Sequence, residues 1–166
     1  MNLDVHGGAY RCLLRLRENA GNPVMSDQEF SANYLSDNCV QIDPAMSSTQ
    51  VIREMAVALG LAADIQISEE YQHILENYRA GRAVLVRLKS DSFSLHSYGE
   101  SDFRVTVLSE MDEERLVVWC PMRNGSWEQL APIDRSTWEA TKAIGITLFE
   151  AKEEQGLLAE EFVNSR

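Results

Sequence analysis

In the second half of the chain, apolar and polar residues alternate at 103–107, and a run of apolar residues follows at 116–119. A period of two places alternate side chains on opposite faces of a β-strand. Turn-forming residues at 111–114 separate the two stretches, which therefore predict a β-hairpin. Asn-Gly at 124–125 is typical of tight hairpin turns and predicts that a further strand at 127–130 pairs with the second stretch. The chain is therefore expected to contain an antiparallel sheet.

Helical periodicity dominates the first half of the chain. Apolar residues recur every three or four positions in several stretches, which are bounded by Gly, Pro or capping residues. The patterns predict helices at 9–18, 26–35, 48–59 and 68–79, a short strand within 61–67, a strong strand at 83–88, a short helix at 134–140 and a last strand at 144–149. Helices followed by strands predict an α+β fold, with N-terminal helices packed on a C-terminal antiparallel sheet.

The chain length of 166 residues is usual for one domain, and we expect a single domain over residues 1–150. Residues 151–166 are rich in Glu and are expected to form an acidic, partly helical tail. The three cysteines are scattered, and the sequence shows neither a secretion signal nor a long apolar segment. These features predict a cytoplasmic protein without disulfides or membrane contact.

The chain carries a formal net charge of −11 and a pI near 4.7. Such a charge repels nucleic acid and anionic membranes, so a peptide or protein, especially a basic one, is the expected partner. The only dense basic run consists of Arg11, Arg15 and Arg17. Arg11 and Arg15 are four residues apart on the first predicted helix, which predicts a solvated helix face.

Three sets of segments resemble a known family. They are His6-Gly7-Gly8-Ala9, then Ser48–Leu61 leading into Ala80–Val86, and finally Asp102–Val107 followed by Leu116–Pro121. In this order they resemble the bacteriocin-processing, double-glycine group of papain-like cysteine peptidases. The resemblance covers residues 6–150 and implies a papain-like fold.

The resemblance also implies where the catalytic residues of such a peptidase would lie. His6 stands in the place of the nucleophilic cysteine, Asp102 in that of the histidine that starts one strand, and Cys120 in that of the aspartate that ends the next. All three identities differ from the family, and no glutamine precedes His6 as an oxyanion donor. The three positions are expected to share one groove, without catalytic residues, a cofactor or a metal ion.

Other cysteine and histidine residues could form a catalytic pair at positions different from those of the family. Thiol hydrolysis needs a thiolate beside an imidazole, and Cys12 or Cys120 with His96 or His6 would supply that pair. The alternative reading is structural: Cys12 lies among the leucines of the first helix, which is typical of a buried thiol, and His96 lies in a predicted loop.

Three functions are compatible with these features. The first is a catalytically inactive peptidase-like domain that binds a peptide or protein segment in the former active-site groove, mainly by adding it to an exposed sheet edge. The second is an active thiol hydrolase with displaced catalytic residues. The third is an acidic chaperone or inhibitor of a basic partner. Trp119, Trp127 and Trp138 are expected in the core or in the wall of the groove.

Overall fold

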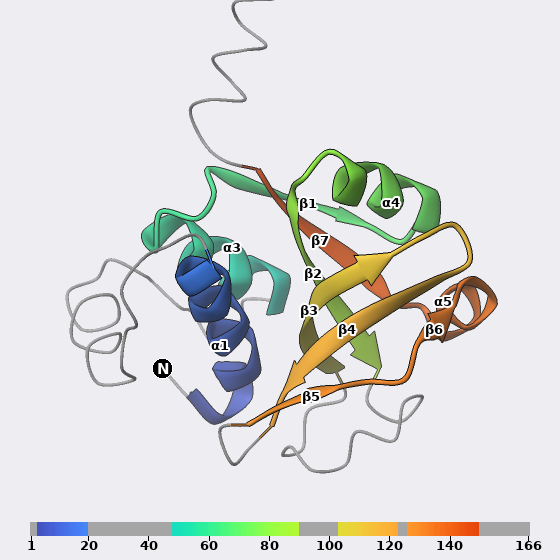
Figure 1. Ribbon diagram of the computed structural model, residues 1–166. Helices are drawn as coiled ribbons and strands as arrows, with labels where there is room; N and C mark the ends of the chain where they lie inside the picture. The colour runs from blue at the N-terminus through green and yellow to red at the C-terminus, as the bar shows by residue number, and fades with distance from the viewer. Residues whose placement is uncertain (1–2, 20–47, 90–102, 123–125, 150–166) are drawn as a thin grey trace, which may run out of the picture.

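The computed structural model describes residues 3–19, 48–89, 103–122 and 126–149, with side chains from residues 11 and 49 onward in the first two stretches. These residues form four α-helices and seven β-strands (Figure 1). The helices are α1 (Leu3–Asn19), α3 (Ser48–Ala58), α4 (Tyr71–Arg79) and α5 (Arg135–Thr141). The strands are β1 (Asp64–Ser68), β2 (Ala83–Lys89), β3 (Phe103–Met111), β4 (Arg115–Pro121), β5 (Trp127–Gln129), β6 (Ile133–Asp134) and β7 (Ile144–Phe149). The predicted α+β class is confirmed.

The strands form one antiparallel sheet in the order β1-β7-β2-β3-β4-β5, with β6 paired to β4 outside this path. The last strand, β7, lies between β1 and β2, which come first in the chain. All of its residues except Phe149 are buried. A strand buried in this way belongs in the centre of a sheet that is covered on both faces.

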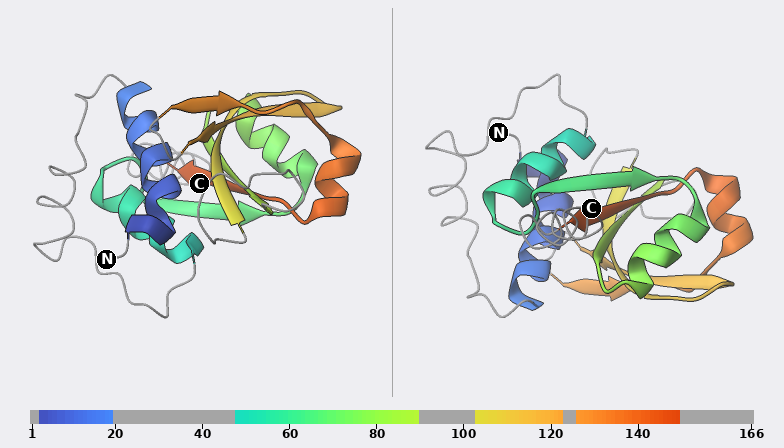
Figure 2. Two further views of the ribbon diagram at one scale, coloured as in Figure 1. Left: turned by 90° about the horizontal axis from the view of Figure 1, so that it is seen from below. Right: turned by 90° about the horizontal axis from the view of Figure 1, so that it is seen from above.

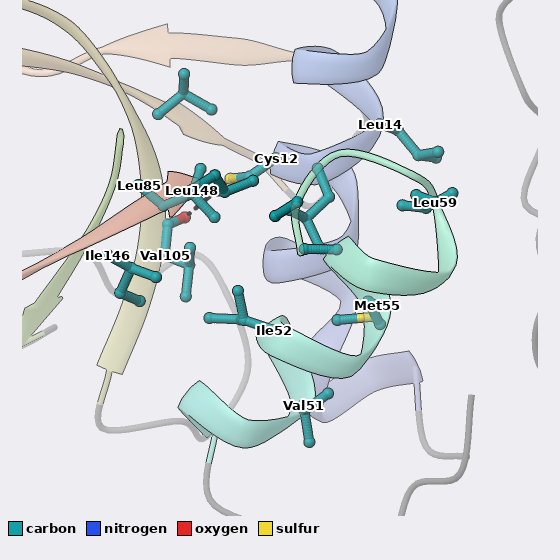
Figure 3. Packing of buried hydrophobic residues seen from close by; sticks show 14 of the residues in the cluster. Cys12, Leu14, Val51, Ile52, Met55, Leu59, Leu85, Val105, Ile146 and Leu148 are labelled. Atoms are coloured by element: carbon teal, nitrogen blue, oxygen red, sulfur yellow. Dashed lines mark hydrogen bonds between the residues drawn. The ribbon is translucent and has the colours of Figure 1, made fainter. Parts of the chain in front are cut away.

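Helices cover both faces of the sheet (Figure 2). We call the core under α1 and α3 the first core and the core under α4 and α5 the second core. Strand β2 contributes to both, because Leu85 belongs to the first core whereas Val84 and Val86 belong to the second. Figure 3 shows the first core, where Cys12 of α1 and Ile52 of α3 point toward the sheet and Leu14 lies beside Leu59.

Local chemistry explains the predicted hairpin, which the structure confirms as β3 and β4. Between them, the Asp112 carboxylate accepts hydrogen bonds from the backbone N–H groups of Glu114 and Arg115, at 2.8 and 2.9 Å. These two bonds hold the pKa of Asp112 below its ordinary value, because they favour the charged carboxylate. An Asp side chain that satisfies its own turn is a typical turn-forming feature.

Most other predicted elements are confirmed with small changes in their ends. Helices α3 and α4 stop before Gly60 and Gly81, whose φ angles of +73° and +83° favour glycine. The strand expected within 61–67 occupies 64–68 instead. Helix α1 begins at Leu3 rather than at residue 9, so its glycines at 7 and 8 lie inside the helix. The predicted helix at 26–35 and the tail at 151–166 lie outside the described residues.

Candidate functional site

The end of β4 contacts the start of β3 through a buried arginine. Arg104 of β3 is only 3% exposed, and its Nη2 donates to the Pro121 carbonyl at 2.8 Å and to the Cys120 Sγ at 3.4 Å. A buried guanidinium needs such acceptors, because leaving its hydration shell is costly. The neighbourhood of the predicted position Cys120 is therefore a packed, hydrogen-bonded corner. Asp102, which directly precedes β3, lies outside the described residues.

Helix α1 lies across the same corner of the sheet. The Arg11 Nη1 donates to the Met122 carbonyl at 2.9 Å, and the Cys12 Sγ lies 3.4 Å from the Val105 carbonyl. His6 is in the N-terminal part of this helix, and its side chain is outside the described residues. The structure thus brings α1, the start of β3 and the end of β4 together, which are the three elements that carry or adjoin the predicted positions.

Strand register shows which side chains face α1. Val107 pairs with Trp119, and Val107 belongs to the first core, so Trp119 also faces the side of α1. Cys120 is the next residue and points to the opposite face, where it joins the second core. Cys120 therefore does not face the helix that carries His6. The relation between the His6 and Asp102 side chains stays a prediction.

Neither thiol within the described stretches is suited to act as a nucleophile. Cys12 and Cys120 are both fully buried and unpaired by a disulfide. Burial raises the pKa of Cys12 well above its ordinary value, and Cys120 raises it further, while Arg104 and Arg15 oppose the rise. Burial also raises the pKa of Cys120, partly offset by the charge and hydrogen bond of Arg104. A raised pKa leaves little thiolate at neutral pH. The other weak candidate, His96, and the third cysteine, Cys39, lie outside the described residues.

The basic face of α1 is not solvated as predicted. The Arg15 guanidinium carbon lies 4.7 Å from the centroid of the Trp127 ring and 5.9 Å from that of Trp119. Both Arg11 and Arg15 are half-buried and contact the β4–β5 hairpin. The prediction was wrong because helical spacing shows which residues share a face but not what packs on that face. Two tryptophans on a neighbouring hairpin were the available signal, since arginine stacks well on indole rings.

Strand β5 offers an edge next to this stack. Hydrogen bonds from Leu130 N–H to the Val118 carbonyl and from Met122 N–H to the Ser126 carbonyl show that even-numbered residues of this segment face β4. The backbone N–H and C=O groups of Trp127 and Gln129 therefore point to the other side. Among the described strands none pairs with that side. We call Arg15, Trp119, Trp127 and this free edge of β5 the Arg15–Trp127 surface.

The core position predicted for a tryptophan is confirmed for Trp138, and the groove-wall position of Trp119 and Trp127 stays a prediction. Trp138 of α5 is buried in the second core, and its Nε1 donates to the Glu69 carbonyl at 2.9 Å. Trp119 and Trp127 are half-buried beside Arg15.

Across the described stretches, no cluster of three or more His, Cys, Asp and Glu side chains is arranged to hold a metal ion. No helix in the same stretches has the length and apolar character needed to cross a membrane.

The fold and the corner under α1 define a mixed α+β protein with an antiparallel sheet between two layers of helices. No family model, curated protein or solved structure matches the chain.

Proposed function

We propose that the chain is a catalytically inactive, papain-like domain, similar to the bacteriocin-processing peptidase group, that binds an extended peptide or protein segment. Binding takes place where the family has its active-site groove, beside α1 and the end of β4. The observation that carries the proposal is the Arg15–Trp127 surface, a stacked arginine and two half-buried indoles next to the free edge of β5.

The packing of α1 supports the papain-like assignment. In that family the first helix carries the nucleophile position, and the two other catalytic positions lie at the start of one strand and the end of the next. Here α1 contacts both β3 and β4 at those ends, through Cys12 and Arg11.

The state of the thiols supports the absence of catalysis. Cys12 donates to a backbone carbonyl in the first core, and Cys120 accepts from Arg104 in the second. Both pKa values are raised, so both thiols stay protonated at neutral pH. A thiol hydrolase that used either of these two cysteines would need that thiol to be accessible and activated.

The free edge of β5 supports strand addition as the mode of binding. Backbone groups of Trp127 and Gln129 would bind the peptide backbone, and the indole rings would contact its side chains. Aromatic and arginine side chains of this kind dominate binding energy at interfaces. The net charge of −11 favours the capture of basic or neutral peptides over acidic ones.

The experiment is selection of binders from a displayed library of random extended peptides, followed by affinity measurement with purified variants. We expect Trp127→Ala to weaken binding at least about tenfold, because it removes an aromatic anchor. Gln129→Pro should also weaken binding, because it removes an outward N–H while leaving the bonds to β4 in place. Gln72→Ala, an exposed change on α4 at the other face of the sheet, is the matched control.

Mass spectrometry of the peptide after long incubation tests the absence of catalysis. The proposal expects intact peptide. Cleavage that an alkylating agent abolishes would show an active thiol hydrolase instead, and affinities that do not change in Trp127→Ala and Gln129→Pro would remove the proposed surface.

A further inference from the structure

The edge of the sheet opposite β5 is β1, a five-residue strand with an almost symmetric sequence. Strand β1 reads Asp64-Ile65-Gln66-Ile67-Ser68 and, among the described strands, pairs only with β7. Figure 2 shows it at the outer margin of the sheet, beside β7. Gln66 is exposed, and Ile67 is 47% exposed. Among the described residues, no strand therefore pairs with the second backbone edge of β1, which lies next to apolar surface.

Neither lysine, proline nor a bulge protects this edge, and its one charged residue, Asp64, accepts the Ile65 N–H at 2.8 Å. Natural proteins guard edge strands with lysine, proline, a bulge or a very short strand. Strand β1 has no Lys or Pro, and its register with β7 runs without interruption from Asp64 to Ser68. The opposite edge, β5, is three residues long, so β1 is the longer of the two strands that end the described sheet.

The sequence of β1 matches itself in the antiparallel direction. Ile65 and Ile67 pair with Leu148 and Ile146 of the first core, so both lie on the face of α1 and α3. A two-fold axis through Gln66, perpendicular to the sheet, would place each of these isoleucines opposite the other isoleucine of a second copy. The same register sets Gln66 opposite Gln66, with every apolar side chain on one face.

Charge does not oppose this pairing at the strand itself. Asp64 is the only charged residue of β1, and its Oδ1 already accepts from the Arg53 Nε at 2.9 Å. In the two-fold register Asp64 lies opposite Ser68 of the second copy, so no like charges meet across the strands. Helix α3, which contacts β1, adds Val57, a second exposed apolar residue.

We infer that the protein forms a two-fold symmetric dimer in which β1 of each copy pairs antiparallel about Gln66, so that one sheet continues through both copies. A second copy is the favoured partner because the sequence of β1 is self-complementary, and closed two-fold dimers arise when one patch fits itself. This inference does not rest on the proposed function, since β1 and β5 are at opposite edges of the sheet.

A charge-exchange experiment tests the register. Gln66 is exposed, so Gln66→Lys and Gln66→Glu leave the cores untouched. In the inferred dimer each variant places like charges directly opposite each other, which we expect to raise the dissociation constant of the dimer at least about tenfold. An equimolar mixture of the two variants places Lys opposite Glu and should restore the dimer. Gln129→Lys, an exposed change on β5, is the matched control and should remain dimeric.

Sedimentation velocity over a concentration series up to roughly 300 µM gives the readout, because a short interface is expected to have micromolar affinity. Wild-type dimers, weakened single variants and a restored mixture support the inference. A wild-type protein that stays monomeric throughout would overturn it. A dimer that is indifferent to both Gln66 variants, or a mixture that is no tighter than either variant alone, would also overturn it.

Discussion

Ile74 of α4 packs directly on the backbone of Gly145 in β7. A Cβ atom placed on Gly145 would come within 2.6 Å of both Cδ1 and Cγ1 of Ile74. Helix α4 can approach the centre of the sheet at this point because residue 145 has no side chain. The second core depends on this approach, since Ile74 is fully buried there.

Gly145→Ala is therefore expected to destabilise the protein by about 1–3 kcal/mol, the usual cost of overpacking a core. Urea unfolding monitored by tryptophan fluorescence measures the free energy of unfolding. The double variant Ile74→Ala with Gly145→Ala provides the control, because the smaller residue makes room for the new methyl group. If the two single effects simply add in the double variant, the close contact is not the cause.

Cys12 and Cys120 should react slowly with iodoacetamide in the native protein and rapidly in denaturant. The reason is burial, which both blocks access and raises their pKa values. Peptide mapping after timed alkylation at neutral pH measures each rate separately. Faster alkylation of either thiol in the native protein than in the unfolded chain would contradict the arrangement described above.

The stability of the protein should fall in strongly alkaline solution partly through Tyr71. Its hydroxyl donates to the Asp112 carbonyl at 2.7 Å, and burial, followed by the nearby Asp112 charge, raises its pKa from 10.0 to about 12. Between these two pH values Tyr71 ionises in the unfolded chain before it does so in the folded protein. Ionisation therefore stabilises the unfolded state, and the free energy of unfolding falls as the pH rises. Below pH 10 Tyr71 is neutral in both states, and its contribution to the free energy of unfolding is fully present.

The variant Tyr71→Phe separates this contribution from other titrating groups. We expect it to cost about 1 kcal/mol at neutral pH, through the lost hydrogen bond, and to decline less steeply than wild type between pH 10 and 12. Unfolding curves at a series of pH values provide the measurement. Parallel decline of the two proteins in this range would show that Tyr71 titrates normally.

A double-mutant cycle between Arg15 and Trp127 should give a coupling energy of about 0.5–1 kcal/mol, typical of a cation–π contact. The same cycle with Trp119 should give a smaller value, because the guanidinium is farther from that ring, 5.9 Å against 4.7 Å. Chemical unfolding of the single and double variants yields both couplings. A larger coupling energy with Trp119 than with Trp127 would mean that Arg15 contacts mainly Trp119.

The candidate site could be anticipated only in part. A resemblance of short motifs pointed to the end of β4, and the structure shows that this end meets β3 and α1. The environment of Cys120 was not predictable, since Arg104 reaches it from the neighbouring strand, 16 residues away in the sequence. Its direction also depends on register, because Cys120 and Trp119 are adjacent in sequence but lie on opposite faces of the sheet.

The amino-acid sequence by itself determined the local elements: the β3–β4 hairpin, the strand after Asn124-Gly125, and helices α3, α4 and α5. These depend on side-chain period and turn chemistry within a few residues. Tertiary packing decided the rest. Helix α1 includes Gly7 and Gly8, which the sequence pattern did not predict, because each glycine costs about 1 kcal/mol in a helix. Tertiary packing inserts β7 between β1 and β2, because only contacts between distant segments choose the neighbours of a strand that is buried on both faces.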